Sequence, residues 1–189
     1  MNVFANILVF QAGWFTTVLG AANGLPMLGP AAALAALALH LRFAQRPAVE
    51  MRLVLTALGL GLAADSLLLA TGWIAYPNGL WVPGIAPYWI ASLWVLFTCT
   101  LNVSMRWLKG RYWLAAAFGA VGGPLSYLAG GRLGAMTFAE PVAAMIALAV
   151  GWGVIMPFLV WLASRLDGFQ AVQRPDYIQD EWRRADTHG

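Results

Sequence analysis

Long apolar stretches alternate with short connections of polar and turn-forming residues along most of this chain. Six such stretches run approximately over residues 3–22, 27–43, 50–71, 86–107, 112–131 and 138–165. Each has close to the ~20 residues that an α-helix needs to cross the hydrocarbon core of a bilayer. The pattern therefore predicts an all-α polytopic membrane protein: a six-transmembrane-helix bundle over residues 1–166, followed by a short polar cytoplasmic tail over residues 167–189.

The composition agrees with this class. Hydrophobic residues make up 61% of the sequence and charged residues only 10%, whereas a soluble domain has about 25% charged residues. A chain this apolar cannot cover itself with polar side chains, so its solvent must be lipid. The net charge of +3 does not indicate nucleic acid as a partner, because no basic patch alternates with stacking aromatic residues.

The basic residues indicate how the bundle is oriented. Of the 11 Lys and Arg residues, all but Arg132 fall on one side of the predicted membrane. In membrane proteins the cytoplasmic loops carry the excess of Lys and Arg. We therefore expect both termini in the cytoplasm, which agrees with an even number of spans.

Asp65 is the clearest candidate for a functional residue, because an ionisable group within a span is costly and needs a partner. Counted from Glu50 at ~1.5 Å per residue, Asp65 lies about 22 Å from the inner surface, in the outer half of the bilayer. It could bind a proton or a ligand. It could equally be a carboxylic acid that burial keeps neutral, or a packing residue hydrogen-bonded to a neighbouring helix.

Arg132 and Glu140 stand at the outer ends of the fifth and sixth spans, on either side of a short turn. The simpler expectation is that they pair with each other, which would account for the one basic residue on the outer side. The alternative is that Arg132 turns inward and presents its forked guanidinium to Asp65 or to an anionic headgroup.

Two Gly-Pro steps, ending at Pro30 and Pro124, fall in the same half of the bilayer as Asp65. Proline frees a backbone carbonyl, and such a break is tolerated in a membrane only where protein or water satisfies it. A polar pocket in the outer half would account for both breaks, whereas close packing on the small residues of the fifth span is the alternative. The candidate ligand-binding residues of this pocket are Asp65, Ser66, Ser126, Tyr127, Arg132 and Glu140.

The sequence holds no complete set of residues for catalysis or for a metal site. His40 stands alone near the inner end of the second span and His188 lies in the tail, so they cannot complete a zinc site or a paired haem. Cys99 is the single cysteine and is expected to be a small core residue. We therefore expect no metal and no cofactor, and the sequence favours a non-enzymatic role without deciding it.

Three segments of the chain are distinctive: ADSLLLATG (64–72), LWVLFTCTLNVSMRWL (93–108) and GGPLSYLAGGRLGA (122–135). They resemble an uncharacterised family of bacterial inner-membrane proteins, the domain of unknown function 2878 family, and the resemblance covers nearly the whole chain. It implies several transmembrane helices in the bacterial inner membrane and no assigned activity or catalytic residue. Relatives often lie beside genes for fatty-acid methylation and flavin-dependent lipid chemistry, so the resemblance also implies a membrane-lipid context.

Three classes of function remain open. We expect a lipid-binding or lipid-processing accessory protein, with membrane lipids as partners, because the polar groups gather in one leaflet and the inner half lacks an ionisable relay. The second class is a small proton-coupled transporter that uses Asp65. The third is a structural or assembly subunit, which would contact another membrane protein or a second copy of this chain.

Overall fold

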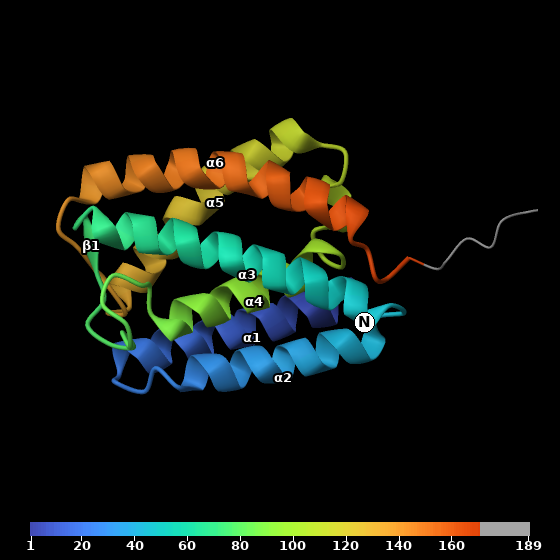
Figure 1. Ribbon diagram of the computed structural model, residues 1–189, viewed down its shortest axis with the longest axis horizontal. Coiled ribbons are helices and arrows are strands. Elements are labelled where there is room, and N and C mark those ends of the chain that lie inside the picture. Colours follow the sequence, from blue (N-terminus) through green and yellow to red (C-terminus); the bar gives the residue numbers. More distant parts are fainter. Residues whose placement is uncertain (171–189) are drawn as a thin grey trace, which may run out of the picture.

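The computed structural model describes residues 1–170. These residues form six α-helices whose long axes lie roughly side by side (Figure 1). The 3-10 helix η1 (Arg106–Leu108) follows the fourth α-helix, and two-residue strands β1 (Ile74–Ala75) and β2 (Thr137–Phe138) pair antiparallel at one end of the bundle. The predicted all-α class is therefore confirmed. The helices are α1 (Val3–Ala22), α2 (Leu28–Phe43), α3 (Pro47–Ala70), α4 (Tyr88–Leu101), α5 (Tyr112–Arg132) and α6 (Pro141–Arg165).

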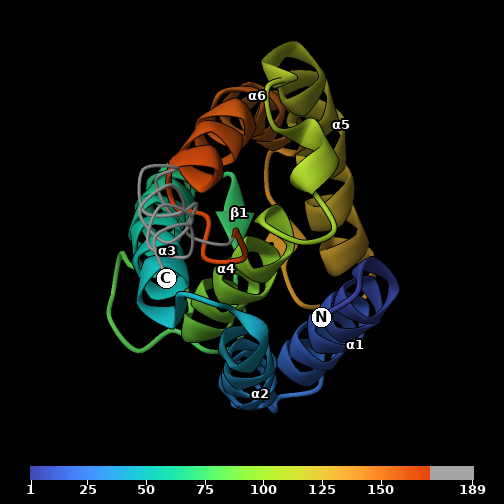
Figure 2. The ribbon, with the colours of Figure 1, turned by 90° about the vertical axis from the view of Figure 1, so that its right-hand side faces the viewer.

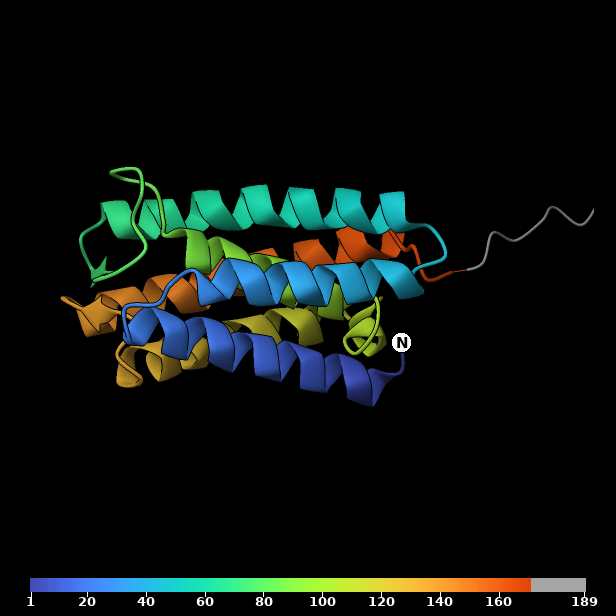
Figure 3. The same cartoon turned by 90° about the horizontal axis from the view of Figure 1, so that it is seen from below.

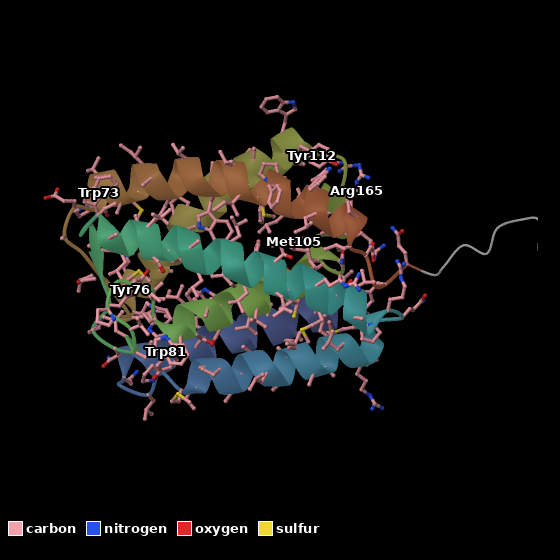
Figure 4. All side chains as sticks on the ribbon, in the orientation of Figure 1. Trp73, Tyr76, Trp81, Met105, Tyr112 and Arg165 are labelled. Carbon is pink, nitrogen blue, oxygen red and sulfur yellow. The ribbon has the colours of Figure 1, made fainter. Side chains whose placement is uncertain are left out.

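The two ends of the bundle differ in chemistry. We call the end that carries β1 and β2 the sheet end, and the opposite end, where the N-terminus and the C-terminal end of α6 both lie, the basic end (Figure 3). Trp73, Tyr76 and Trp81 lie at the sheet end, whereas Tyr112 and Arg165 lie toward the basic end (Figure 4). The common position of the chain's described ends agrees with an even number of crossings, and their placement in the cytoplasm stays a prediction.

Four of the helices are long and apolar enough to cross a bilayer: α1, α3, α5 and α6. The other two are shorter, with 16 residues in α2 and 14 in α4. At ~1.5 Å per residue α4 is about 21 Å long, less than the ~30 Å hydrocarbon core. The chain is thus a multi-pass membrane protein by the length and composition of its helices, and six crossings stay a prediction.

The fourth predicted span, 86–107, ends earlier as a helix than the sequence suggested. α4 stops at Leu101, and the residues that follow form turns and then η1. The backbone N–H of Met105 donates to the carbonyl of Thr100 at 2.9 Å, while the side chain of Asn102 bonds to other segments. Irregular backbone is tolerated here because protein encloses it: Asn102 is 1% exposed and Leu108 is fully buried.

α4 lies at the centre of the bundle, with α1, α2 and α3 around it and α6 on its remaining side (Figure 2). Its buried side chains include Trp89, Trp94 and Leu96. α5 packs mainly against α6, so these two helices form a pair beside the other four. The central position lets α4 contribute to sites on both sides of the bundle.

Glycines set how closely α5 and α6 approach each other. A Cβ added to Gly119 would collide with the backbone carbonyl of Trp152, and one added to Gly123 would collide with the Trp152 ring. A Cβ on Gly122, by contrast, would meet open space. Two glycines of α5 are therefore packing residues, while Gly122 leaves a space unfilled.

The two Gly-Pro steps do not interrupt their helices, contrary to the interpretation of the sequence. Pro30 lies in the first turn of α2, where a missing N–H breaks no intrahelical hydrogen bond. Pro124 lies inside α5, which nevertheless continues to Arg132. The space beside α5 thus arises from its small residues and not from a broken helix.

We expect Gly119→Ala to lower the free energy of unfolding by about 1–3 kcal/mol, because overpacking against the backbone of α6 forces the two helices apart. Gly122→Ala on the same helix is the matched control, and it should leave stability unchanged or raise it by up to ~1 kcal/mol. Unfolding by sodium dodecyl sulfate in detergent micelles, followed by circular dichroism, measures both variants. Equal stability of the two would contradict this account of the α5–α6 contact.

Candidate functional site

Asp65 lies on α3 and is 2% exposed, so neighbouring helices enclose its carboxylate. One carboxylate oxygen accepts a hydrogen bond from the indole N–H of Trp94 on α4 at 2.6 Å, and the other accepts one from the hydroxyl of Tyr127 on α5. The carboxylate therefore joins three helices. None of the ion pairs within residues 1–170 includes Asp65, so neutral donors hold it.

Trp94 can approach α3 closely because Gly61 leaves room for its ring. Gly61 precedes Asp65 by about one turn, and a Cβ at that position would overlap the indole of Trp94. Trp94 also stacks on Trp152 of α6, with ring centroids 4.8 Å apart and planes 3° from parallel. We call Trp94, Tyr127 and Trp152 the aromatic wall, since all three line two separate cavities.

The larger cavity has a volume of about 410 Å³ and lies between α1, α4 and α5. We call it the α1–α5 groove. The indole N–H of Trp14 on α1 bridges it by donating to the hydroxyl oxygen of Ser126 on α5 at 3.2 Å. Exposed side chains of both helices form its rim, so the groove opens at the surface between them; these are Gln11, Phe15, Phe118, Leu125 and Ser126.

The smaller cavity has a volume of about 230 Å³ and lies between α3 and α6. We call it the α3–α6 cavity. Asp65 lines this cavity and does not line the α1–α5 groove. Trp73 joins the aromatic wall in its lining, and the exposed residues Leu67 and Thr71 lie at its rim. Both cavities are thus largely apolar, and the smaller one also contains a carboxylate among aromatic rings.

Asp65, Trp94 and Tyr127 come from three distant segments, 64–72, 93–108 and 122–135, which the fold brings to one point. Residues 3–158 match the family described as Protein of unknown function (DUF2878). The chain belongs to the DUF2878 family. Neither a curated protein nor a solved structure matches the chain.

The structure brings only part of the expected polar pocket together in this DUF2878 protein. Asp65 and Tyr127 are directly hydrogen-bonded. Ser126 lines the α1–α5 groove instead, where it bonds to Trp14. The hydroxyl oxygen of Ser66 accepts a hydrogen bond from the backbone N–H of Ala86 at 3.0 Å, so Ser66 holds the connection that leads into α4. Whether these residues bind a ligand stays a prediction.

Arg132 and Glu140 lie apart from this pocket. Arg132 ends α5, Glu140 precedes α6, and both side chains are exposed at the sheet end. The ion pairs found within residues 1–170 do not include the expected pair between Arg132 and Glu140. Arg132 also does not turn inward, because the donors to Asp65 are Trp94 and Tyr127. The physical reason is the connection between them, which contains β2 and pairs with β1 instead of closing a tight turn.

A second buried polar cluster, at the basic end, was not predicted. Glu50 in the first turn of α3 is fully buried and pairs with His40 of α2 at 2.8 Å. It also accepts hydrogen bonds from the side chain of Asn102 at 2.7 Å and from the backbone N–H of Gly168 at 2.6 Å. The basic end therefore contains a buried pair of titratable side chains, and the expectation that the inner half lacks an ionisable relay stays a prediction. The available signal was two titratable residues, His40 and Glu50, on either side of one short connection between spans.

Asp167 extends this cluster beyond the end of α6. It is 2% exposed, and its oxygens pair with Arg106 at 3.0 Å and with Lys109 at 2.6 Å. Burial by itself would raise its pKa, but the hydrogen bond and positive charge of Lys109 outweigh burial and hold the pKa of Asp167 below its ordinary value of 3.8. Asp167 belongs to the segment predicted as a polar tail, most of which, residues 171–189, lies outside the described residues.

We expect Tyr127→Phe to lower the free energy of unfolding by about 1–3 kcal/mol, because the buried carboxylate of Asp65 loses one of its two donors. Tyr112→Phe is the matched control on the same helix, since Tyr112 is 41% exposed, and it should change stability by less than about 0.5 kcal/mol. Detergent unfolding of both variants measures the difference. A Tyr127→Phe protein as stable as Tyr112→Phe would show that this hydrogen bond does not hold α5 to α3.

We expect the contribution of Asp167 to stability to depend on pH. A carboxylate whose folded pKa is depressed stabilises the fold above its unfolded pKa, and this contribution is lost as pH falls through the folded pKa. Asp167→Asn should therefore be less stable than wild type by about 1–3 kcal/mol at neutral pH, and the difference should shrink below about pH 4. Thermal unfolding in detergent across the acid range tests this, and a difference independent of pH would assign the loss to packing alone.

Proposed function

We propose that this protein is a lipid-binding accessory protein that holds one hydrocarbon chain of a membrane lipid in the α1–α5 groove. The observation that carries the proposal is the groove itself, a cavity of about 410 Å³ that opens between two helices. Its lining is mainly aliphatic and aromatic, and Gln11 and Ser126 are the polar side chains at its rim. Cavities with apolar walls and a few convergent polar groups are typical sites for small ligands.

The dimensions of the groove suit a single chain. Its lining on α5 extends from Phe118 to Gly130, which at ~1.5 Å per residue is about 18 Å. One leaflet contributes about half of the ~30 Å hydrocarbon core. A chain from one leaflet would therefore lie along the groove, parallel to α5.

The groove is also placed for access from the side. α1 and α5 have few backbone contacts with each other, and the hydrogen bond from Trp14 to Ser126 connects them across the opening. A single hydrogen bond contributes only about 0.5–1.5 kcal/mol net. Its rupture would let a lipid chain move between the bilayer and the groove without any rearrangement of the central helix α4.

The proposal includes the cellular setting. We infer the bacterial inner membrane, with both termini in the cytoplasm and membrane lipids as the partners. The charge distribution supports this orientation, because Arg42, Arg46 and Arg52 flank the α2–α3 connection at the basic end while Arg132 stands at the sheet end. We favour an accessory role over catalysis because no nucleophile is paired to a base among the residues that line the groove.

A proton-coupled carrier is the second candidate, and the position of Asp65 beside the α3–α6 cavity favours it. Ionisable residues within membrane segments often belong to proton or ion pathways. The Glu50–His40 pair supplies another buried titratable site toward the basic end. A carrier needs a route that joins these two sites, whereas lipid binding in the groove needs none.

We expect Gly122→Leu to reduce the lipid that copurifies with the protein at least several-fold. Gly122 lines the groove and its Cβ position faces open space, so the leucine side chain should fill the groove without disturbing the α5–α6 contact. Gly59→Leu is the matched control, because Gly59 on α3 also faces open space and lines neither cavity. Native mass spectrometry of protein extracted in mild detergent measures the bound lipid.

Wild type that carries no bound lipid, or equal lipid occupancy in both leucine variants, would contradict lipid binding in the groove. Proton uptake by proteoliposomes separates the second candidate from the first. Flux that Asp65→Asn abolishes, together with wild-type lipid occupancy in Gly122→Leu, would favour the carrier.

A further inference from the structure

We propose that the α3–α6 cavity binds a small organic ammonium ion, with the carboxylate of Asp65 as its counter-charge. The site is distinct from the α1–α5 groove, because Asp65 lines only the smaller cavity. The ligand is defined by its chemistry: a positively charged nitrogen within a compact, weakly hydrated group.

The first support is the buried carboxyl group of Asp65, which has no positively charged partner among residues 1–170. Asp167, which is almost fully buried, has such a partner in Lys109, and the fully buried Glu50 contacts the imidazole of His40. Asp65 receives only the neutral donors of Trp94 and Tyr127. Burial of a charge is costly unless an opposite charge compensates it. A cation in the adjoining cavity would supply that compensation.

The second support is the material of the cavity walls. Trp73 and the aromatic wall line the cavity together with aliphatic side chains, and Thr71 adds one hydroxyl at the rim. Aromatic rings attract ammonium groups, and sites for quaternary ammonium ligands are built from such rings. A metal ion would need several oxygen or nitrogen ligands, and no three His, Cys, Asp or Glu side chains converge within the described part of the chain. The walls therefore select an organic cation.

The third support is size and access. The cavity volume of about 230 Å³ is several times the ~30 Å³ that one water molecule occupies in the liquid, so a group as large as choline has room. Leu67 and Thr71, at the rim, belong to the last turn of α3 and the residue after it, near the sheet end. This end carries aromatic side chains typical of the headgroup region. The nitrogen can therefore belong to a dissolved amine or to the headgroup of a lipid.

Titration of the purified protein in maltoside micelles with choline chloride or tetramethylammonium chloride tests the proposal. We expect saturable heat of binding and a higher Tm at up to about 10 mM ligand, tenfold above a millimolar Kd. Sodium chloride and the neutral carbon analogue of choline, matched in concentration, should produce neither effect. The neutral analogue has the same shape, so it separates recognition of charge from simple filling of the cavity.

Two variants remove the site in different ways. Asp65→Asn should weaken ammonium binding at least tenfold by removing the counter-charge. Gly151→Leu should do so by occupying the space, because Gly151 lines the cavity and its Cβ position is free of contacts. Gly59→Leu should bind as wild type does. If Asp65→Asn does not fold, Gly151→Leu still decides the question.

The proposal is overturned if wild type binds no ammonium ion, if the neutral analogue binds equally well, or if Gly151→Leu binds as wild type does. Nanodiscs identify the source of the nitrogen. Choline binding that persists in discs of phosphatidylglycerol and is lost in discs of phosphatidylcholine or phosphatidylethanolamine supports a lipid headgroup as occupant. Binding in all three supports a dissolved amine. The readout is the binding of ammonium and not of lipid, so failure here leaves the accessory role standing.

Discussion

A carboxylate inside a helix bundle in a membrane must obtain its hydrogen bonds from the protein, because hydrocarbon offers none. Asp65 obtains them from Trp94 and Tyr127, and so fixes α4 and α5 relative to α3. The arrangement then depends on small residues. Trp94 fits only because Gly61 has no side chain, and Trp152, stacked on Trp94, fits only because α5 presents glycines to it. The contacts around one polar group thus require glycine at positions on two helices, α3 and α5.

The basic end meets the same requirement with an imidazole, a side-chain amide and a backbone N–H instead of indole and phenol groups. Glu50 draws α2, the segment after α4 and the segment after α6 to one point through His40, Asn102 and Gly168. This explains why α4 is short. The side chain and backbone of Asn102 serve that cluster, so the chain leaves the helix after Leu101 and stays buried where other segments satisfy its polar groups. The central helix is therefore held by polar contacts at its end as well as along its length.

The apolar stretches predicted the helices well. A helix in lipid must be apolar over its whole length, and the hydrophobicity of each residue can be read from the sequence without knowledge of its contacts. Asp65 was likewise visible as a costly charge. Contacts between distant segments were not visible. Nothing local indicates that Trp94 rather than Arg132 would reach Asp65, or that Glu50, at the start of a span, would be fully buried. Such pairings depend on the rotation of each helix about its axis, which nearly uniform hydrophobicity leaves undetermined.

The aromatic wall gives the two cavities a common boundary with different chemistry on each side. Tyr127 lines both, and its hydroxyl bonds to the carboxylate that faces only the α3–α6 cavity. In the two proposals, a positive charge beside Asp65 would compete with the Tyr127 hydroxyl for the same oxygens, and a lipid chain in the α1–α5 groove would contact the same ring. Energetic coupling between sites requires an element that both sites bias. In this fold Tyr127 is the side chain that the two proposed sites share, because it lines both cavities and bonds to Asp65.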